Sequence, residues 1–176
     1  MNKIMFNDKF LLTKAVLNGT KTMTRRVIKK EIPFGNWQET EKTLRYKVGE
    51  VVAVAQRYSD IGAASFDEWE RETNWFKKGF SNKMFVRADL MPHHIKITDV
   101  RVERLQDITE EDCSKEGIIH LKALGIGGYG YITADGECSM CDTPRDAYAE
   151  LINDICGKGT WERNPWVEAY TFEKAI

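Results

Sequence analysis

An alternation of apolar and polar residues over positions 95–105 constrains the fold of this chain more than any other feature. Ile95 and Ile97 alternate with polar residues, and Val100 and Val102 continue the alternation on the opposite parity. A period of two residues is typical of a β-strand with one buried face. The change of parity predicts a β-bulge near Thr98-Asp99. The chain is therefore expected to contain a long strand that needs partner strands.

Shorter segments predict those partners and several helices. We expect strands over residues 22–28, 51–55, 84–88 and 166–172, and helices over residues 8–17, 65–75, 109–116 and 143–156. Asp8 is the expected N-cap of the first helix, and Gly19 follows it where a left-handed turn favours glycine. Gly79 is expected to end the second helix. Thr109 opens a capping box, and Thr143-Pro144 combines an N-cap with a proline in the first turn.

Strands with helices inserted between them indicate an α+β domain. We expect a small, mostly antiparallel β-barrel with flanking helices as its core. The 176 residues are enough for one domain, residues 1–176, with a core that needs no disulfide support. The glycine-rich stretch over residues 124–131 lacks the spacing of a phosphate-binding loop, so we interpret it as a flexible insertion.

Composition narrows the function classes. The net charge is −1, so nucleic-acid binding would have to rest on a local patch. No apolar run approaches the ~18 residues of a membrane span, and the N-terminal residues turn polar too soon for a signal peptide. We therefore expect a cytoplasmic protein with no membrane partner. In that compartment Cys113, Cys138, Cys141 and Cys156 would be reduced thiols.

No metal and no cofactor are expected. Cys138 and Cys141 form a lone C-x-x-C pair, whereas a structural zinc site needs four ligands. The spacing of the other candidate ligands does not match a zinc-site motif; these ligands are Cys113, Cys156, His93, His94 and His120. A redox role would need a strand-to-helix setting, which this pair lacks.

The stretch Gly19-Thr20-Lys21-Thr22-Met23-Thr24-Arg25-Arg26 joins a predicted helix to a predicted strand. It lies in a window without carboxylates that holds six cations: Lys14, Lys21, Arg25, Arg26, Lys29 and Lys30. A cationic turn with hydroxyl groups is a suitable place to bind a polar or anionic ligand. The alternative is that the window is a solvated strand and loop surface.

The same stretch resembles the signature turn of the ASCH domain family, which has the pattern Gly-x-Lys-x-x-(Glu or Thr)-x-Arg. Residues 47–52 (Lys-Val-Gly-Glu-Val-Val) are similar to the next strand of that family. Residues 97–112 and 161–167 are similar to segments of its phage and prophage branch. The resemblance implies a PUA-like barrel with a cleft lined by the Lys21 turn. It leaves residues 58–82 and 121–142 as variable insertions.

The resemblance also implies three alternative functions. ASCH domains are proposed to bind RNA or nucleotides and nucleosides, here through a cleft at the Gly19–Arg26 turn. One bacterial branch consists of amidohydrolases that remove the acetyl group of N4-acetylcytidine. Its catalytic lysine, threonine and glutamate fall by position on Lys21, Thr24 and Glu116. The third alternative is a phage-associated interaction or morphogenesis protein without a small-molecule site.

Amide hydrolysis needs a nucleophile, a proton acceptor that becomes a donor, and stabilisation of the oxyanion. Thr24 could supply the hydroxyl or position a water, and a neutral Lys21 could take the proton if burial and nearby cations lowered its pKa. Glu116 could carry a proton to the leaving amine. The structural alternative is a Lys21–Glu116 salt bridge that closes the barrel mouth, with Thr24 an ordinary strand residue.

Ligand contacts are expected from Lys21, Arg25, Arg26 and Tyr58. Arg26 can act as a fork for a phosphate or a base edge, or form a surface ion pair with an acid of residues 107–112. Tyr58 can stack on a base or simply pack in the core. Relatives of the phage branch carry an acidic residue and a tryptophan near positions 56–58, where this chain has Gln-Arg-Tyr. An acid–base role for that strand is therefore in doubt.

Overall fold

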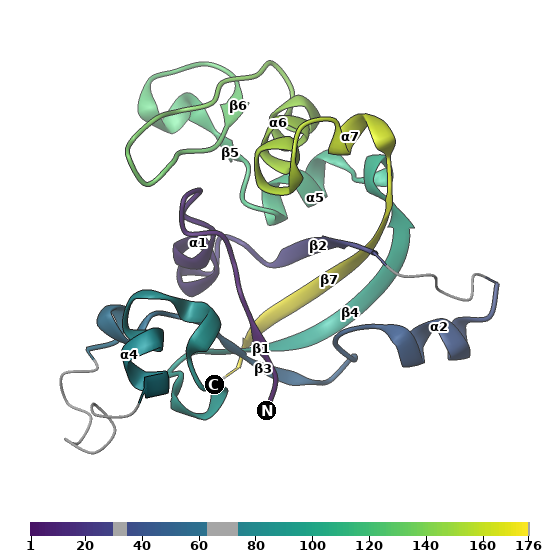
Figure 1. Ribbon diagram of the computed structural model, residues 1–176. Helices are drawn as coiled ribbons and strands as arrows, with labels where there is room; N and C mark the ends of the chain where they lie inside the picture. The colour runs from purple at the N-terminus through teal and green to yellow at the C-terminus, as the bar shows by residue number, and fades with distance from the viewer. Residues whose placement is uncertain (30–34, 63–73, 176) are drawn as a thin grey trace.

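The computed structural model describes residues 1–29, 35–62 and 74–175 as a mixed α+β fold around one five-stranded sheet (Figure 1). The strands are β1 (Lys3–Ile4), β2 (Met23–Val27), β3 (Val51–Val54), β4 (His94–Arg104) and β7 (Trp166–Ala175), in the order β1-β3-β4-β7-β2. Strands β1 and β3 are parallel, and the other neighbours are antiparallel. The predicted fold class and the mostly antiparallel pairing are confirmed.

The long strands β4 and β7 pair along nearly their whole length and form the centre of the sheet. Their register shifts between Ile97 and Asp99, so the predicted bulge is confirmed. Ile95, Ile97 and Val100 are all buried in the main apolar core, although Val100 has the opposite parity to the two isoleucines. The bulge keeps the apolar side chains of one strand on the same face of the sheet.

The described strands do not close into a barrel, so the predicted barrel is wrong. Strand β1 has only two residues and pairs with β3 alone, and β2 pairs with β7 alone. After β1 the chain leaves the sheet toward helix α1 (Leu12–Asn18). The Nη2 of Arg26 on β2 donates to the carbonyl of Met5, just beyond β1, at 2.6 Å. A side chain therefore bridges two edges that backbone pairing would join in a barrel.

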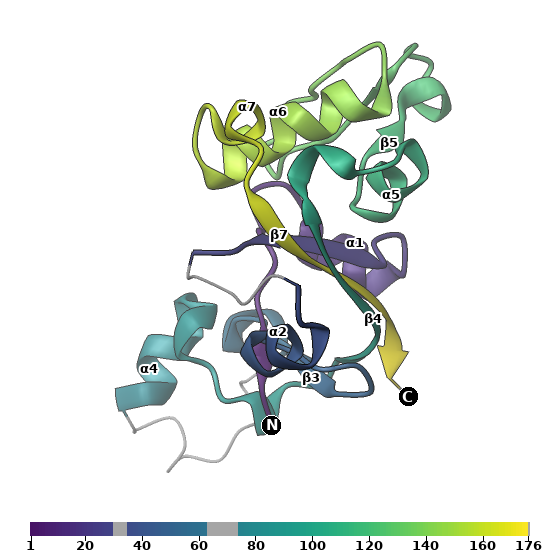
Figure 2. The same cartoon turned by 90° about the vertical axis from the view of Figure 1, so that its right-hand side faces the viewer.

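Helices and a small hairpin surround the sheet. They are α2 (Trp37–Thr43), α4 (Asn74–Ser81), α5 (Glu110–Lys115), α6 (Pro144–Cys156), α7 (Thr160–Arg163), and the paired strands β5 (Ile119–His120) and β6 (Tyr129–Gly130). Figures 1 and 2 show α5, α6, α7 and the hairpin together beyond one end of the sheet, with α4 near the other end. Among the described helices, none is both long and apolar enough to cross a membrane.

Local signals decide where several helices begin and end. Gly19 has φ 79° and donates its N–H to the last carbonyls of α1, as predicted. Thr109 and Thr143 cap α5 and α6 by accepting from the N–H three residues ahead. The predicted N-cap at Asp8 is wrong, because α1 begins at Leu12 after a left-handed Leu11. The Asp8 carboxylate instead accepts from Thr13 and Lys83.

The region before β4 differs most from expectation. Residues 84–88 are not a strand: they lead from one 3₁₀ turn, Lys83–Phe85, to a second, Ala88–Leu90. Most of the helix predicted over residues 65–75 lies outside the described residues. Gly79 lies inside α4 rather than at its end, and a Cβ at this position would overlap the ring of Tyr58. The glycine allows the helix to pack closely against that ring.

Candidate functional site

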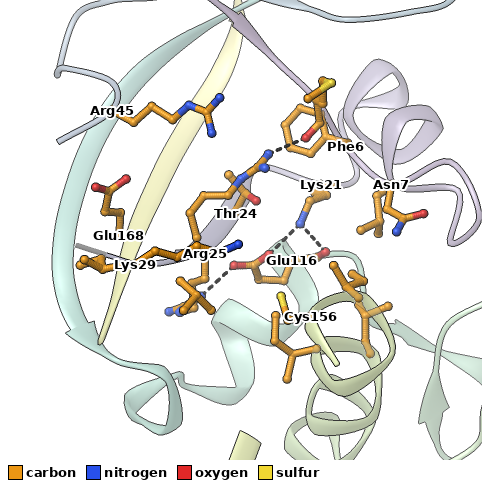
Figure 3. A pocket seen from close by; sticks show the side chains of 18 of the residues that line it. Phe6, Asn7, Lys21, Thr24, Arg25, Lys29, Arg45, Glu116, Cys156 and Glu168 are labelled. Carbon is orange, nitrogen blue, oxygen red and sulfur yellow. Dashed lines mark hydrogen bonds and ion pairs between the residues drawn. The ribbon is translucent and has the colours of Figure 1, made fainter. Parts of the chain in front are cut away.

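A cavity of about 990 Å³ lies where the sheet fails to close, between the chain that follows β1 and strand β2. Helix α6 forms an apolar side of the cavity, and the mostly polar end of α2 forms another side. Five parts of the chain contribute lining side chains with chemical roles: Lys21, Thr24, Arg25, Arg26 and Lys29 around β2; Lys42 and Arg45 around α2; Glu116 after α5; Tyr148, Leu151, Ile155 and Cys156 from α6; and Glu168 from β7. Figure 3 shows most of this lining.

Lys21 is held at the entrance of β2 by backbone contacts on both sides. Its N–H donates to Ala15 at the end of α1, and the next N–H, of Thr22, donates to Lys115 at the end of α5. The Lys21 Nζ donates to Glu116 twice, to the Oε2 at 2.7 Å and to the backbone carbonyl at 2.6 Å. Lys21 is 2% exposed and Glu116 is 4% exposed. The structure thus brings two of the three proposed catalytic residues into a buried ion pair (Figure 3).

Arg25 is completely engaged by acids from other elements. Its Nη1 donates to Glu116 Oε1 at 3.2 Å, its Nη2 to Asp112 Oδ2 at 2.7 Å, and its Nε to Glu103 Oε1 at 3.0 Å. Arg101, whose side chain is exposed, donates to the same Asp112 oxygen at 2.8 Å. We call Lys21, Arg25, Glu103, Asp112 and Glu116 the ion-pair floor. Because its guanidinium is so occupied, Arg25 holds Glu116 in place rather than offering a free fork to a ligand.

The ion-pair floor shifts the proton affinities of its members. Burial lowers the pKa of Lys21, and the charges of Arg26 and Arg25 act in the same direction, while Glu116 opposes them. Burial by itself lowers the pKa of Arg25, but the adjacent carboxylates outweigh it and raise that pKa above its ordinary value. The ammonium of Lys21 also lies against a carbonyl at the C-terminal end of α5, where a positive charge is favoured.

Thr24 is buried and lines the same cavity. It pairs in register with Tyr170 of β7. Within the described residues its hydroxyl makes no hydrogen bond, so it can bind a ligand or a water. Lys21, Thr24 and Glu116 therefore converge on one cavity, although they come from two distant parts of the chain. Figure 3 shows the three labelled residues in one view.

A second group of cations lines the outer part of the cavity. Arg26 is half-buried, whereas Lys29, Lys42 and Arg45 are exposed. We call these four the cationic rim. Glu168 faces the same space and is buried, and its Oε2 accepts from the Tyr170 hydroxyl at 2.6 Å. In Figure 3, Lys29, Arg45 and Glu168 lie to one side of the Lys21–Glu116 pair.

Two contacts that the sequence suggested are absent from this arrangement, one expected for Tyr58 and one offered as an alternative for Arg26. Tyr58 does not line the cavity: its ring is buried in a separate cluster with Val86 and Met91, and its hydroxyl accepts from the N–H of Arg87. Arg26 forms no ion pair with the acids of residues 107–112: its Nη2 donates to the carbonyl of Met5, and Asp112 pairs with Arg25 and Arg101. We therefore leave Tyr58 out of the site that we propose below.

Sequence reasoning missed several residues of the site. No motif assigned these residues to the site: Glu103 and Asp112 of the floor, and Lys42, Arg45, Tyr148, Cys156 and Glu168 of the lining. They come close to the Lys21 turn only in the folded chain. The four cysteines are free thiols, of which Cys113 is buried and Cys138 exposed. Among the described residues no cluster of three or more histidine, cysteine or acidic side chains has the arrangement of a metal site.

No family model matches the sequence, and no curated protein matches it. In structure, the chain is similar to a protein from Enterococcus faecalis V583 assigned to the DUF984 family model. The identity is 14% and the TM-score 0.48, over 99% of this chain and 80% of that one. It is also similar to an ASCH domain from Lactobacillus crispatus JV V101, with 13% identity and a TM-score of 0.41, over 96% of this chain and 75% of that one. These values are too low to place the chain in either family.

Proposed function

We propose that the cavity binds a nucleoside unit, as a free nucleoside or nucleotide or as one exposed residue of an RNA. The observation that carries this proposal is the two-sided lining. Polar groups of Thr24 and Glu116 face the same space as the apolar side of α6, where Tyr148, Leu151 and Ile155 lie. A planar base with an edge of hydrogen-bonding groups matches such a site.

The size of the cavity supports a small ligand. Pockets for small molecules commonly enclose ~300–1,000 Å³, and this one, at about 990 Å³, is at the upper end of that range. The ASCH resemblance of residues 19–26 points to the same ligand class. An interaction protein without a small-molecule site would not need Lys21, Thr24 and Glu116 at one cavity.

Binding is tested by thermal stabilisation with the four ribonucleosides and short single-stranded RNAs. Two variants address the site: Thr24→Val removes the free hydroxyl with little change in volume, and Ile155→Trp fills the apolar side. We expect both to lose the stabilisation that the wild type shows. Lys14→Ala is the matched control, because Lys14 belongs to the same cationic window but does not line the cavity. If no nucleoside or RNA stabilises the wild type, the proposal is wrong.

A second candidate function is hydrolysis of an acyl group from a nucleoside, and the direct Lys21–Glu116 contact favours it. In this reaction water adds to the acyl carbon, the C–N bond breaks, and the products are a carboxylic acid and the free amine. Glu116 would take a proton from the water and pass it to the leaving nitrogen. The Lys21 ammonium would stabilise the oxyanion, and Thr24 would orient the water.

Turnover is measured by the release of cytidine from N4-acetylcytidine and from a panel of other acylated nucleosides. We expect Lys21→Ala and Glu116→Ala to abolish release, and Glu116→Gln to abolish it while keeping the shape of the floor. Ligand binding without any product would support the binding function and exclude the hydrolase. Wild-type turnover that Glu116→Gln leaves unchanged would exclude Glu116 as the proton carrier.

A further inference from the structure

We propose that the cationic rim is a phosphate subsite, so that the ligand of the cavity is a nucleotide with a terminal phosphate rather than a bare nucleoside. This inference rests on the proposed function, because it assigns the outer half of the same cavity. It also sets an orientation: the base lies toward the ion-pair floor and α6, and the phosphate lies at the rim.

The charges of the rim are not balanced by the fold. No ion pair to Arg26, Lys29, Lys42 or Arg45 occurs among the described residues, although other exposed cations of the chain have such partners. Arg57 pairs with Asp60, and Lys115 pairs with Glu111. Four cations that line one cavity without an ion pair repel one another, and an anion would relieve that repulsion.

Arg26, the half-buried member of the cationic rim, carries an unsatisfied donor. Its Nη2 donates to the carbonyl of Met5, and its guanidinium lies 5.7 Å from the centre of the Phe6 ring. Its Nε is buried and has no hydrogen-bond partner. A buried donor without a partner costs free energy, so its presence beside a cavity indicates that a ligand or water completes it. Arginine donors suit the oxygens of a phosphate.

Glu168 is the acid that could have neutralised the rim, and it does not do so. It lies opposite Arg26 in the register of β2 and β7, where side chains are close enough to pair. Yet Arg26 reaches Met5, and one Glu168 oxygen is held by the Tyr170 hydroxyl. Its other oxygen remains available to accept from a ligand hydroxyl, such as those of a ribose. Glu116, the other acid of the lining, is occupied by Lys21 and Arg25.

The test compares each ribonucleoside with its 5′-monophosphate by isothermal titration calorimetry. We expect the monophosphate to bind at least ~10-fold more tightly, the gain typical of charge-assisted hydrogen bonds. In the double variant Lys42→Gln/Arg45→Gln the advantage should fall below ~3-fold, while the affinity for the nucleoside stays the same. These two side chains are exposed, so the variant is expected to fold. Arg26→Gln should act in the same direction, and Lys14→Gln serves as the control.

The outcomes separate this inference from the proposed function. Equal affinity for nucleosides and monophosphates, or an advantage that the double variant retains, overturns the phosphate subsite and leaves the nucleoside site intact. Inorganic phosphate that binds the wild type but not the double variant, with no binding of any nucleoside, supports the subsite and overturns the nucleoside proposal. No binding of any of these probes overturns both.

A final comparison identifies the source of the phosphate. A short single-stranded RNA is titrated with a 5′-phosphate and with a 5′-hydroxyl. Preference for the phosphorylated RNA over the free monophosphate assigns the subsite to an RNA end. Equal or weaker binding of the RNA assigns it to a free nucleotide.

Discussion

The two halves of the cavity treat positive charge in opposite ways. At the ion-pair floor Lys21 and Arg25 are buried, and three carboxylates engage them. At the cationic rim Arg26, Lys29, Lys42 and Arg45 have no acidic partner among the described residues, and three of the four are exposed. The charges of the floor are therefore balanced without a ligand, whereas those of the rim are not.

This difference separates structural charge from charge available for binding. A buried charge needs a partner of opposite charge, because its desolvation without one costs several kcal/mol of folding free energy. An exposed charge can stay unpaired at little cost and remains free for an anion. The composition of the window over residues 14–30 does not distinguish the two kinds. Removing charges from the floor and from the rim should therefore have different effects on stability.

The largest effect is expected from Glu116→Ala. The substitution leaves Lys21 and part of Arg25 buried without their shared counter-charge, so we expect the free energy of unfolding to fall by ~3–5 kcal/mol. Urea or guanidinium unfolding measures this directly. A loss below ~1 kcal/mol would mean that water reaches the floor and that the contrast with the rim does not hold.

Arg25→Lys should come next. Lysine keeps the charge but cannot donate in a fork to Glu103, Asp112 and Glu116 together, so we expect a loss of ~2–3 kcal/mol in the same unfolding experiment. Arg101→Lys is the matched control, because Arg101 is an exposed partner of the same Asp112, and its loss should stay within ~1 kcal/mol. Equal losses for the two variants would show that the buried Arg25 stabilises the fold no more than the exposed Arg101 does.

A pH effect follows from Asp112. Burial by itself raises the pKa of Asp112, but hydrogen bonds from Arg101 and Arg25 outweigh it and hold the pKa below the ordinary value of 3.8. A carboxyl group with a lowered pKa contributes stability above its unfolded value, and this contribution is lost as the pH falls through the folded value. Stability should therefore drop below pH 3.8, and Asp112→Asn should flatten that part of the curve. An unchanged acid limb in the variant would exclude Asp112 as its origin.

The smallest effect on stability is expected at the rim. Arg45→Gln removes one of four unpaired cations, so we expect the free energy of unfolding to change by no more than ~0.5 kcal/mol, with any gain largest at low salt. The same variant should weaken the salt dependence of nucleotide binding. A loss of stability above ~1 kcal/mol would show that the contact of Arg45 with the Tyr46 ring, at 5.6 Å, stabilises the fold, and that Arg45 is a structural cation like those of the floor.

Local patterns in the sequence predicted the parts of the fold that depend on neighbouring residues. The alternation over residues 95–105 predicted β4 and its bulge, and Gly19, Thr109 and Thr143 marked helix ends. Such signals act within a few residues, through backbone conformation and capping hydrogen bonds, so the sequence shows them directly. The mixed α+β class followed from the same signals. The position of Lys21 at the entrance of β2 also followed from them.

Tertiary structure decided the features that depend on contacts between distant parts of the chain. The open sheet depends on the chain leaving β1 after two residues, and the burial of Tyr58 depends on Gly79 in α4. The meeting of Lys21 with Glu116, 95 residues away, was suggested only by the family resemblance. Whether a cation is paired or free depends on which acids the whole fold brings within about 4 Å of it, because charge pairing is decided by distance in space and by burial.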